Sequence, residues 1–232
     1  MKNILRKLYN SETLTKIIHT RKYCLQKELK DCSTVLDLGC GHNSPIQCCK
    51  NITYSIGVDV FKPYIDLARK RNTHSELICE KLDEIKFPDQ SFDAVVMIEV
   101  LEHMPKQQGM DLIRKAEKWA KKKVILTTPN IYFSGFESDG NPYEKHISLW
   151  NCKELAKLGF RTNGLVGLKF LRKEADMSNL HNDDDLVGTI KYSPKYFWLM
   201  ISILSQIFTY YLPQYAFELI SVKDVEKKIT TK

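Results

Sequence analysis

The sequence predicts an α/β protein with a doubly wound, mostly parallel sheet and helices on both faces. Short apolar runs alternate with helix-like stretches at intervals of roughly 20 to 35 residues, the spacing of parallel strands joined by helical crossovers. A length of 232 residues suits one domain with its own core. The composition, 43% hydrophobic and 27% charged, excludes collagen-like, disordered and disulfide-scaffold proteins.

Local patterns place the elements along the chain. Residues 13–30 carry spaced Leu and Ile side chains among basic residues, which predicts an amphipathic helix. A second helix is expected over 62–71, where Pro63 occupies an early helical position, and a third over 112–122. The predicted strands share a short apolar run and cover 33–39, 55–60, 77–79, 92–98 and 123–128.

The positive charge is concentrated at the N-terminus. The chain has a formal net charge of +7, and residues 1–30 hold eight basic residues against two acidic ones. The remainder is close to neutral, so a domain that coats nucleic acid is not expected. Seven cysteines without a CxxC pair, and no signal-peptide pattern before Tyr9, predict reduced thiols and a cytoplasmic protein.

A glycine-rich turn follows the first predicted strand. It has the form Gly39-x-Gly41-x-Asn43, without the third glycine of a dinucleotide-binding turn. Asp37 precedes it, and a carboxylate there would repel a pyrophosphate but attract an ammonium or sulfonium group. Asp59 ends the second strand, where an acid can accept both hydroxyls of a ribose. A plain strand–helix turn is the alternative for the two glycines taken alone.

Residues 35–43 resemble the cofactor turn of class I S-adenosylmethionine-dependent methyltransferases. Residues 87–103 are similar to the fourth-strand motif of the broad subgroup that contains the quinone-biosynthesis methyltransferases. Residues 127–130 and 158–160 match the usual end of strand five and the turn before strand six. The resemblance implies a Rossmann-like sheet of about seven strands with an antiparallel last strand.

The resemblance also implies how the chain is divided. A basic helical segment covers residues 1–30, and the S-adenosylmethionine-binding core covers 31–175. Residues 176–232 add a surface loop, an apolar helix and the last strand of the same domain.

The cofactor implied is S-adenosylmethionine. Asp37, Gly39 and Gly41 would hold its methionine part and Asp59 its ribose, while Glu99 would lie near the transferred methyl group. Lys81 stands where the family has its adenine-contacting Asp, and Asp83 is the substitute we consider. The predicted cofactor-binding set is Asp37, Gly39, Cys40, Gly41, Asp59, Val60, Asp83 and Glu99.

Three residues are the candidates for catalysis: His146, His103 and Glu144. Methyl transfer to a hydroxyl requires alignment and removal of a proton, and a histidine near the carboxyl ends of the strands can accept it. The alternatives are a packing role for His146, a turn-fixing role for His103 and a solvated loop charge for Glu144. We expect a metal-independent reaction, because the sequence shows no ligand spacing typical of a metal site.

The acceptor is expected to be a small molecule, a glycan or a lipid-linked molecule, methylated at oxygen. Residues 98–101 lack the Asn/Asp-Pro-Pro-Tyr motif of nucleic-acid amino-methyltransferases, so no nucleic-acid partner is expected. A carbon- or nitrogen-directed methyltransferase of the same fold is one alternative. A non-catalytic cofactor-binding protein is the other.

The C-terminal region contains an uncharged stretch over 196–217. Ser202, Ser205, Gln206 and Thr209 form a polar stripe at helical spacing, which favours a helix packed on the domain. Together with residues 1–30, the helix over 196–212 also suits a peripheral contact with an anionic membrane, and its aromatic face suits a second copy of the chain. Residues 215–222 are predicted to form the last strand, and 177–188 a surface loop.

Overall fold

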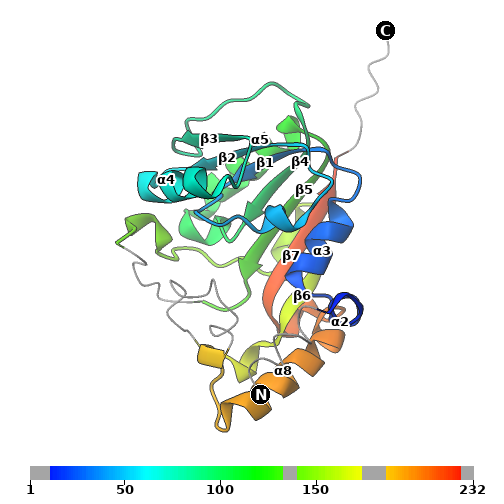
Figure 1. The fold of residues 1–232 in the computed structure, drawn as a ribbon. Coiled ribbons are helices and arrows are strands. Elements are labelled where there is room, and N and C mark those ends of the chain that lie inside the picture. Colours follow the sequence, from blue (N-terminus) through cyan, green and yellow to red (C-terminus); the bar gives the residue numbers. More distant parts are fainter. Residues whose placement is uncertain (1–10, 133–139, 174–186, 226–232) are drawn as a thin grey trace.

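The computed structural model describes residues 11–132, 140–173 and 187–225. They form one seven-stranded sheet with strand order β3-β2-β1-β4-β5-β7-β6 (Figure 1). The strands are β1 (Thr34–Leu38), β2 (Tyr54–Asp59), β3 (Glu76–Cys79), β4 (Phe92–Ile98), β5 (Ala120–Pro129), β6 (Arg161–Leu168) and β7 (Ala216–Asp224).

Strand directions match the predicted fold class. β1 pairs in parallel with β2 and β4, β2 with β3, and β4 with β5. β7 is antiparallel to both of its neighbours, β5 and β6. The expected α/β sheet with an antiparallel last strand is therefore confirmed, and each predicted strand overlaps an observed one.

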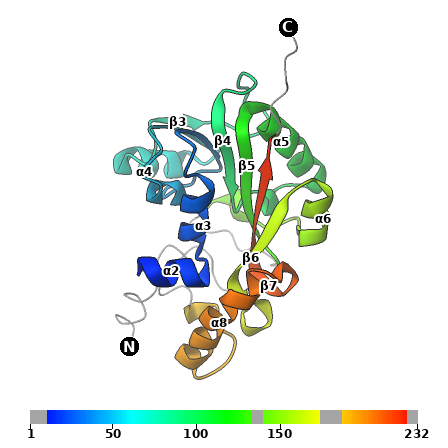
Figure 2. The same cartoon turned by 90° about the vertical axis from the view of Figure 1, so that its right-hand side faces the viewer.

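Helices cover both faces of the sheet (Figure 2). One face carries α3 (Arg21–Glu28), the short turn η1 (Pro45–Cys48) and α4 (Lys62–Arg71). The opposite face carries α5 (Lys106–Trp119) and α6 (Cys152–Lys157). Each face has its own hydrophobic core, since Leu25 packs in one buried cluster and Ile113 in the other.

Two predicted helices differ from the observed ones. The single helix expected over 13–30 is two helices, α2 (Glu12–Ile18) and α3, because His19 has a left-handed φ of 50° and Thr20 caps α3 by accepting a hydrogen bond from the Tyr23 amide. The helix expected from residue 112 begins at Lys106, since its first turn is polar and gives no apolar periodicity.

The C-terminal helix α8 (Lys195–Thr209) packs its polar stripe against β6. The Gly167 amide donates to Gln206 Oε1 at 2.6 Å, and the Leu168 amide donates to Ser205 Oγ at 3.0 Å. The helix thus packs on the domain, with its polar side inward. Its apolar side is open to solvent, with large exposed side chains at Phe197, Met200, Leu204 and Phe208.

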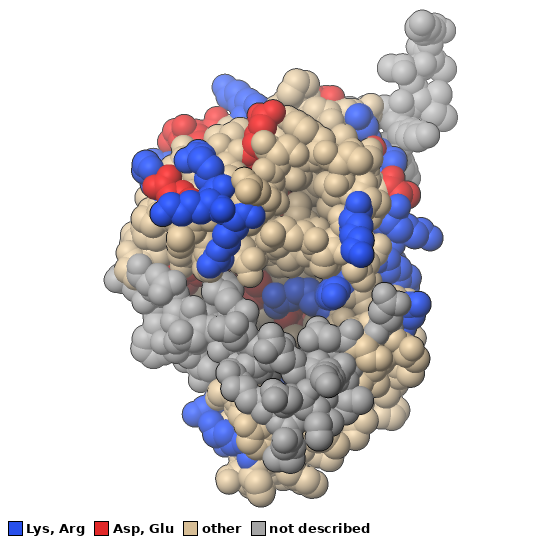
Figure 3. Space-filling view, viewed as in Figure 1, with Lys and Arg blue, Asp and Glu red and all other residues tan. Residues whose placement is uncertain are grey.

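The surface over α8 carries few charges in Figure 3, whereas Lys and Arg side chains gather over α4. Among the described residues, no helix has the length and apolar character needed to cross a membrane. The loop predicted over 177–188 lies mostly outside the described residues.

The cysteines behave as predicted. All seven are free thiols, and Cys24, Cys32, Cys40 and Cys49 are buried.

Candidate active site

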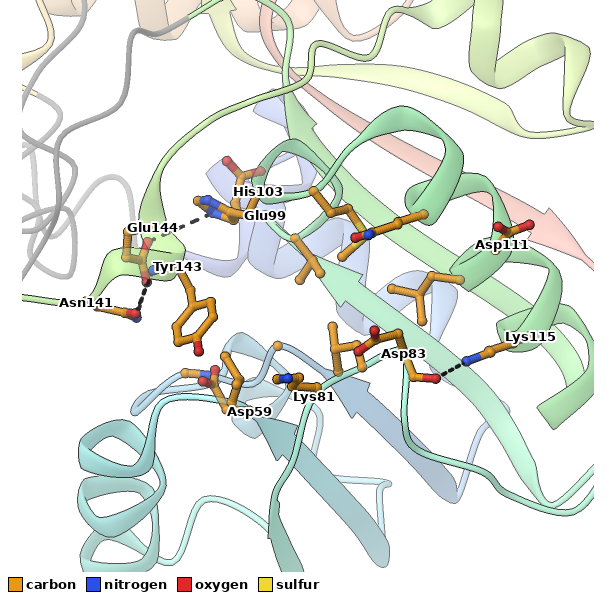
Figure 4. A pocket seen from close by; sticks show the side chains of 18 residues that line it. Asp59, Lys81, Asp83, Glu99, His103, Asp111, Lys115, Asn141, Tyr143 and Glu144 are labelled. Carbon is orange, nitrogen blue, oxygen red and sulfur yellow. Dashed lines mark hydrogen bonds and ion pairs between the residues drawn. The ribbon is translucent and has the colours of Figure 1, made fainter.

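A cavity of about 550 Å³ opens at the carboxyl ends of the parallel strands (Figure 4). Loops that follow β1, β2 and β4 form one side, and the segment around η3 (Pro142–Glu144) forms another. Ligands of open α/β sheets bind at this edge, where the loops diverge between neighbouring strands.

The turn after β1 is shaped by its two glycines. Gly39 and Gly41 have φ values of 71° and 56°, a conformation that disfavours other residues. A Cβ atom on Gly39 would lie 2.6 Å from Val100 Cγ2, whereas one on Gly41 would meet nothing within 4 Å. Gly41 therefore leaves open space beside the cavity for a ligand. Asn43 is not among the residues with positive φ, so it needs no glycine-like conformation.

Asp59 connects this turn to β2. Its Oδ2 accepts a hydrogen bond from the Gly41 amide at 3.0 Å, and its Oδ1 accepts one from the Phe61 amide at 2.8 Å. Each carboxylate oxygen keeps a further lone pair. Burial raises the pKa of Asp59 above its usual value. The open glycine turn and this carboxylate on the cavity wall fit the ribose of S-adenosylmethionine.

Asp37 lies beneath the turn and is not among the residues that line the cavity. It is 1% exposed, and its Oδ2 accepts a hydrogen bond from Ser44 Oγ and lies 3.1 Å from His74 Nε2. These contacts fix the side chain of Asp37 under the glycine turn and so stabilise the turn. The predicted contact of Asp37 with the methionine part stays a prediction, as does that of Cys40, which is also buried.

The β3 loop lines the cavity with Lys81, Leu82 and Asp83. Both residues considered for the adenine position are therefore present on the wall. Lys115 of α5 holds this loop by donating to the Asp83 carbonyl at 2.6 Å.

Glu99 follows β4 directly and lines the cavity, as expected. It has a φ of 55°, and its Oε1 accepts a hydrogen bond from Thr127 Oγ1 at 2.7 Å. Burial, reinforced by the charge of Glu218, raises the pKa of Glu99 to about 7. A carboxyl group with a raised pKa thus lies where the resemblance places the transferred methyl.

The three catalytic candidates lie close together. His103 and Glu144 line the cavity, with His103 Nε2 3.9 Å from Glu144 Oε2 (Figure 4). His146 is not among the lining residues, and its ring packs edge-on against His103 with centroids 4.8 Å apart. Burial lowers the pKa of each histidine to about 4, so both imidazoles are neutral at neutral pH.

Glu102 is the residue of this region that the sequence analysis missed. It lies in the short turn η2 (Leu101–His103) and is 1% exposed. Burial, with the charge of Glu99, raises the pKa of Glu102 well above its usual range. The signal available in the sequence was the place of Glu102 directly before His103, for which a turn-fixing role was the alternative to catalysis.

Comparison with known proteins agrees with this geometry. Residues 36–127 match the family model described as a methyltransferase domain. Among solved structures, the methyltransferase domain of bacterial CtHen1 has a TM-score of 0.52 at 17% identity and covers 90% of this chain and 100% of its own. That likeness shows the fold. Together these findings confirm the predicted class I methyltransferase fold and S-adenosylmethionine as its cofactor.

Two curated relatives match this chain over only part of their own length. The probable tRNA methyltransferase 9B of Bos taurus is 29% identical over 145 residues, which is 62% of this chain and 31% of that protein. The (S)-coclaurine N-methyltransferase of Thalictrum flavum subsp. glaucum is 29% identical over 133 residues, 53% of this chain and 36% of that protein. The chain therefore spans about a third of the length of these relatives. Neither match tests the quinone-biosynthesis subgroup, which stays a prediction.

Proposed function

We propose that the protein is an S-adenosylmethionine-dependent methyltransferase that methylates an oxygen atom of a small-molecule, glycan or lipid-linked acceptor. The observation that carries this proposal is one cavity with two chemically different ends. Gly39, Gly41 and Asp59 lie at one end, and His103 and Glu144 lie at the other. The cofactor supplies an electrophilic methyl group on a sulfonium.

The end of the cavity with Gly39, Gly41 and Asp59 binds and orients the cofactor. Asp59 accepts the ribose hydroxyls, and the turn of Gly39 and Gly41 lets the backbone approach the methionine part. Asp83 and Lys81 flank the adenine position. An in-line displacement gains most of its rate from such alignment, because the reacting atoms must lie about 3 Å apart.

The end of the cavity with His103 and Glu144 takes the proton of the acceptor hydroxyl. A hydroxyl acceptor must lose a proton as its oxygen is methylated, and a neutral imidazole or a carboxylate can take it. His103 faces the cavity and its pKa of about 4 keeps it unprotonated. Glu144 lies beside it with a side chain 33% exposed, which opens a path to solvent.

Nitrogen is the alternative acceptor atom, and one relative is named as an N-methyltransferase. An amine acceptor needs the same cofactor end but less help with deprotonation. Mass spectrometry shows the addition of one methyl group, and the carbon-13 chemical shift of that methyl separates an O-methyl from an N-methyl product. Loss of activity for every hydroxyl acceptor with retention for an amine would overturn the oxygen assignment.

Titration calorimetry with S-adenosylmethionine tests the proposal itself. We expect one binding site per chain, with S-adenosylhomocysteine competing for it. No heat of binding at protein concentrations of tens of micromolar would overturn the methyltransferase proposal and leave a non-catalytic or ligand-free role.

A peripheral contact with an anionic membrane is a further part of the proposal. α2 packs beside α8, so the basic residue Lys16 in its last turn lies in the same part of the molecule as α8. An apolar helix face next to positive charge favours an anionic bilayer surface. Flotation with vesicles containing phosphatidylserine should carry the protein upward, and Phe208→Ser should reduce this. Equal recovery with neutral vesicles would argue against the electrostatic part.

A further inference from the structure

Three side chains that can bind a metal ion lie close together at the cavity wall and behind it. One donor atom from each of Glu102, His103 and His146 lies within 4.8 Å of the other two. They come from two segments far apart in the sequence, η2 and the stretch after η3. His103 also lines the cavity, so this cluster faces the place where the acceptor would lie.

The two segments are fixed to each other by their backbones. The amides of Ile147 and Ser148 donate to the Glu102 carbonyl at 2.8 and 3.0 Å. Ser148 Oγ donates to the Leu101 carbonyl at 2.9 Å. None of these bonds uses a side chain of the cluster. The fold therefore holds His146 beside Glu102 through the backbone.

Glu102 has an unusual environment for a buried carboxyl group. Both of its carboxylate oxygens are buried, and neither has a hydrogen-bond partner among the described residues. The buried hydroxyl of Thr128 on β5 is near this carboxyl group and lowers its pKa, but it does not reach it with hydrogen-bond geometry. A buried polar group without a partner destabilises the fold, so such a group calls for an occupant that compensates it.

His103 presents a lone pair in the same region. Its Nδ1 lies 3.4 Å from the Lys145 carbonyl, which can only accept a proton, so this contact favours the tautomer with the hydrogen on Nδ1 and the lone pair on Nε2. That Nε2 atom lies 3.9 Å from Glu144 Oε2. A nitrogen lone pair and a carboxylate oxygen that face each other favour a cation. A carbonyl bonded to the other ring nitrogen is also the usual support of a metal-bound histidine.

We propose that Glu102, His103 and His146 bind one divalent transition-metal ion. Two imidazoles and one carboxylate form a donor set that suits ions from manganese to zinc better than magnesium or calcium, which prefer oxygen. Ligands about 2.1 Å from one ion lie roughly 3 to 4 Å apart, so small side-chain rotations close the cluster. Three protein ligands leave positions open for an acceptor oxygen.

The role of this ion rests on the proposed methyl transfer. A bound cation lowers the pKa of a coordinated hydroxyl, which makes its oxygen a nucleophile at neutral pH. Because His103 is then a ligand of the ion, it no longer takes the proton, and the acceptor O–H loses its proton to Glu144 and then to solvent. The oxygen forms a bond to the methyl carbon while the carbon–sulfur bond breaks, and the sulfur keeps the bonding pair.

Mn²⁺ is the best probe, because the chain has seven free thiols that would bind Zn²⁺ elsewhere. Electron paramagnetic resonance of Mn²⁺ titrated with the intact protein should show one ion bound per chain. Glu102→Gln and His146→Ala should each weaken this binding at least tenfold, while Glu117→Gln on α5 should leave it unchanged. Mn²⁺ should also raise the melting temperature of the wild type but not of Glu102→Gln.

Two outcomes overturn the proposal: no stoichiometric Mn²⁺ binding, or equal binding by wild type and Glu102→Gln with both folded by circular dichroism. Titration of the same samples with S-adenosylmethionine separates this result from the proposed function. Cofactor binding without Mn²⁺ binding removes the metal and keeps the methyltransferase. Mn²⁺ binding without cofactor binding keeps the site and removes its role in methyl transfer.

Discussion

Arg21 and Glu218 form an ion pair across 197 residues of chain, with Arg21 Nε 2.9 Å from Glu218 Oε1. Arg21 begins α3 and Glu218 lies on β7, where its side chain is only 4% exposed. The same arginine lowers the pKa of Glu99, while Glu218 raises it. This pair therefore joins the N-terminal helices to the central sheet and contributes to the charge balance beneath the candidate site.

Replacing Arg21 should be strongly destabilising. Arg21→Leu leaves the Glu218 carboxylate buried without its main partner, which costs about 3 kcal/mol in free energy of unfolding. Urea denaturation of the wild type and the variant measures this difference. The double variant Arg21→Leu with Glu218→Gln should recover much of the loss, and additive losses would contradict the pairing.

Asp59 should control cofactor affinity, and Asp59→Asn should cost only moderate stability because it can still accept one of the two backbone hydrogen bonds. Asp59→Asn keeps the shape but weakens hydrogen bonds to the ribose, so the dissociation constant of S-adenosylmethionine should rise by about 10- to 100-fold. Calorimetry gives the affinity, and thermal unfolding reports the fold. Asp66→Asn, at an exposed position of α4 that pairs with Lys62, is the matched control and should bind normally.

The two glycines of the β1 turn should respond differently to alanine. Gly39→Ala combines a left-handed φ with a clash against Val100 and should destabilise the protein by more than about 2 kcal/mol. Gly41→Ala meets open space, so only the cost of its φ, about 1 kcal/mol, should appear. Denaturant unfolding of both variants checks this order. A larger loss for Gly41→Ala would contradict the described turn.

Ionisation of the Asp93 carboxyl group should make the free energy of unfolding depend on pH. Although burial opposes it, hydrogen bonds from Ser33 and Thr34 and the charge of Lys122 lower the pKa of Asp93 to about 2. Because the folded-state pKa lies below the unfolded value of about 3.9, the stabilisation is complete above pH 4 and disappears as the pH falls towards 2. It amounts to about 2 kcal/mol at neutral pH.

Unfolding of the wild type and Asp93→Asn at pH 7 and at pH 2 to 3 measures this effect. The gap in stability between the two should be largest at pH 7 and should narrow on acidification. A constant gap would mean that packing, and not the ionised carboxylate, accounts for the difference.

Sequence patterns predicted those parts of the fold that depend on local periodicity. The apolar run 92–98 coincides with β4, and the helix expected over 62–71 coincides with α4. The break at His19 escaped detection because a left-handed residue between two amphipathic turns leaves the apolar pattern almost unchanged. The start of α5 was missed because the first turn of this helix is polar.

The candidate site was predictable only in part. Gly39, Gly41, Asp59 and Glu99 line the cavity as expected, because their positions at strand ends fix where the backbone carries them. Ser44 and His74 hold Asp37 beneath the turn, and its expected contact with the ligand stays a prediction. The approach of His146 to Glu102 depends on a backbone contact between segments more than 40 residues apart, which no local pattern reveals.

The position of β7 has a consequence for how the chain folds during synthesis. β6 pairs with β7 and lies at the edge of the sheet, while β5 meets β7 on its other side. Since β7 emerges from the ribosome after both neighbours, β6 has no hydrogen-bonding strand until residues 216–224 have been synthesised. The five parallel strands β1 to β5 can assemble earlier. Premature stops before Ala216 should therefore yield a partial sheet with an open edge at β5, a species prone to aggregate.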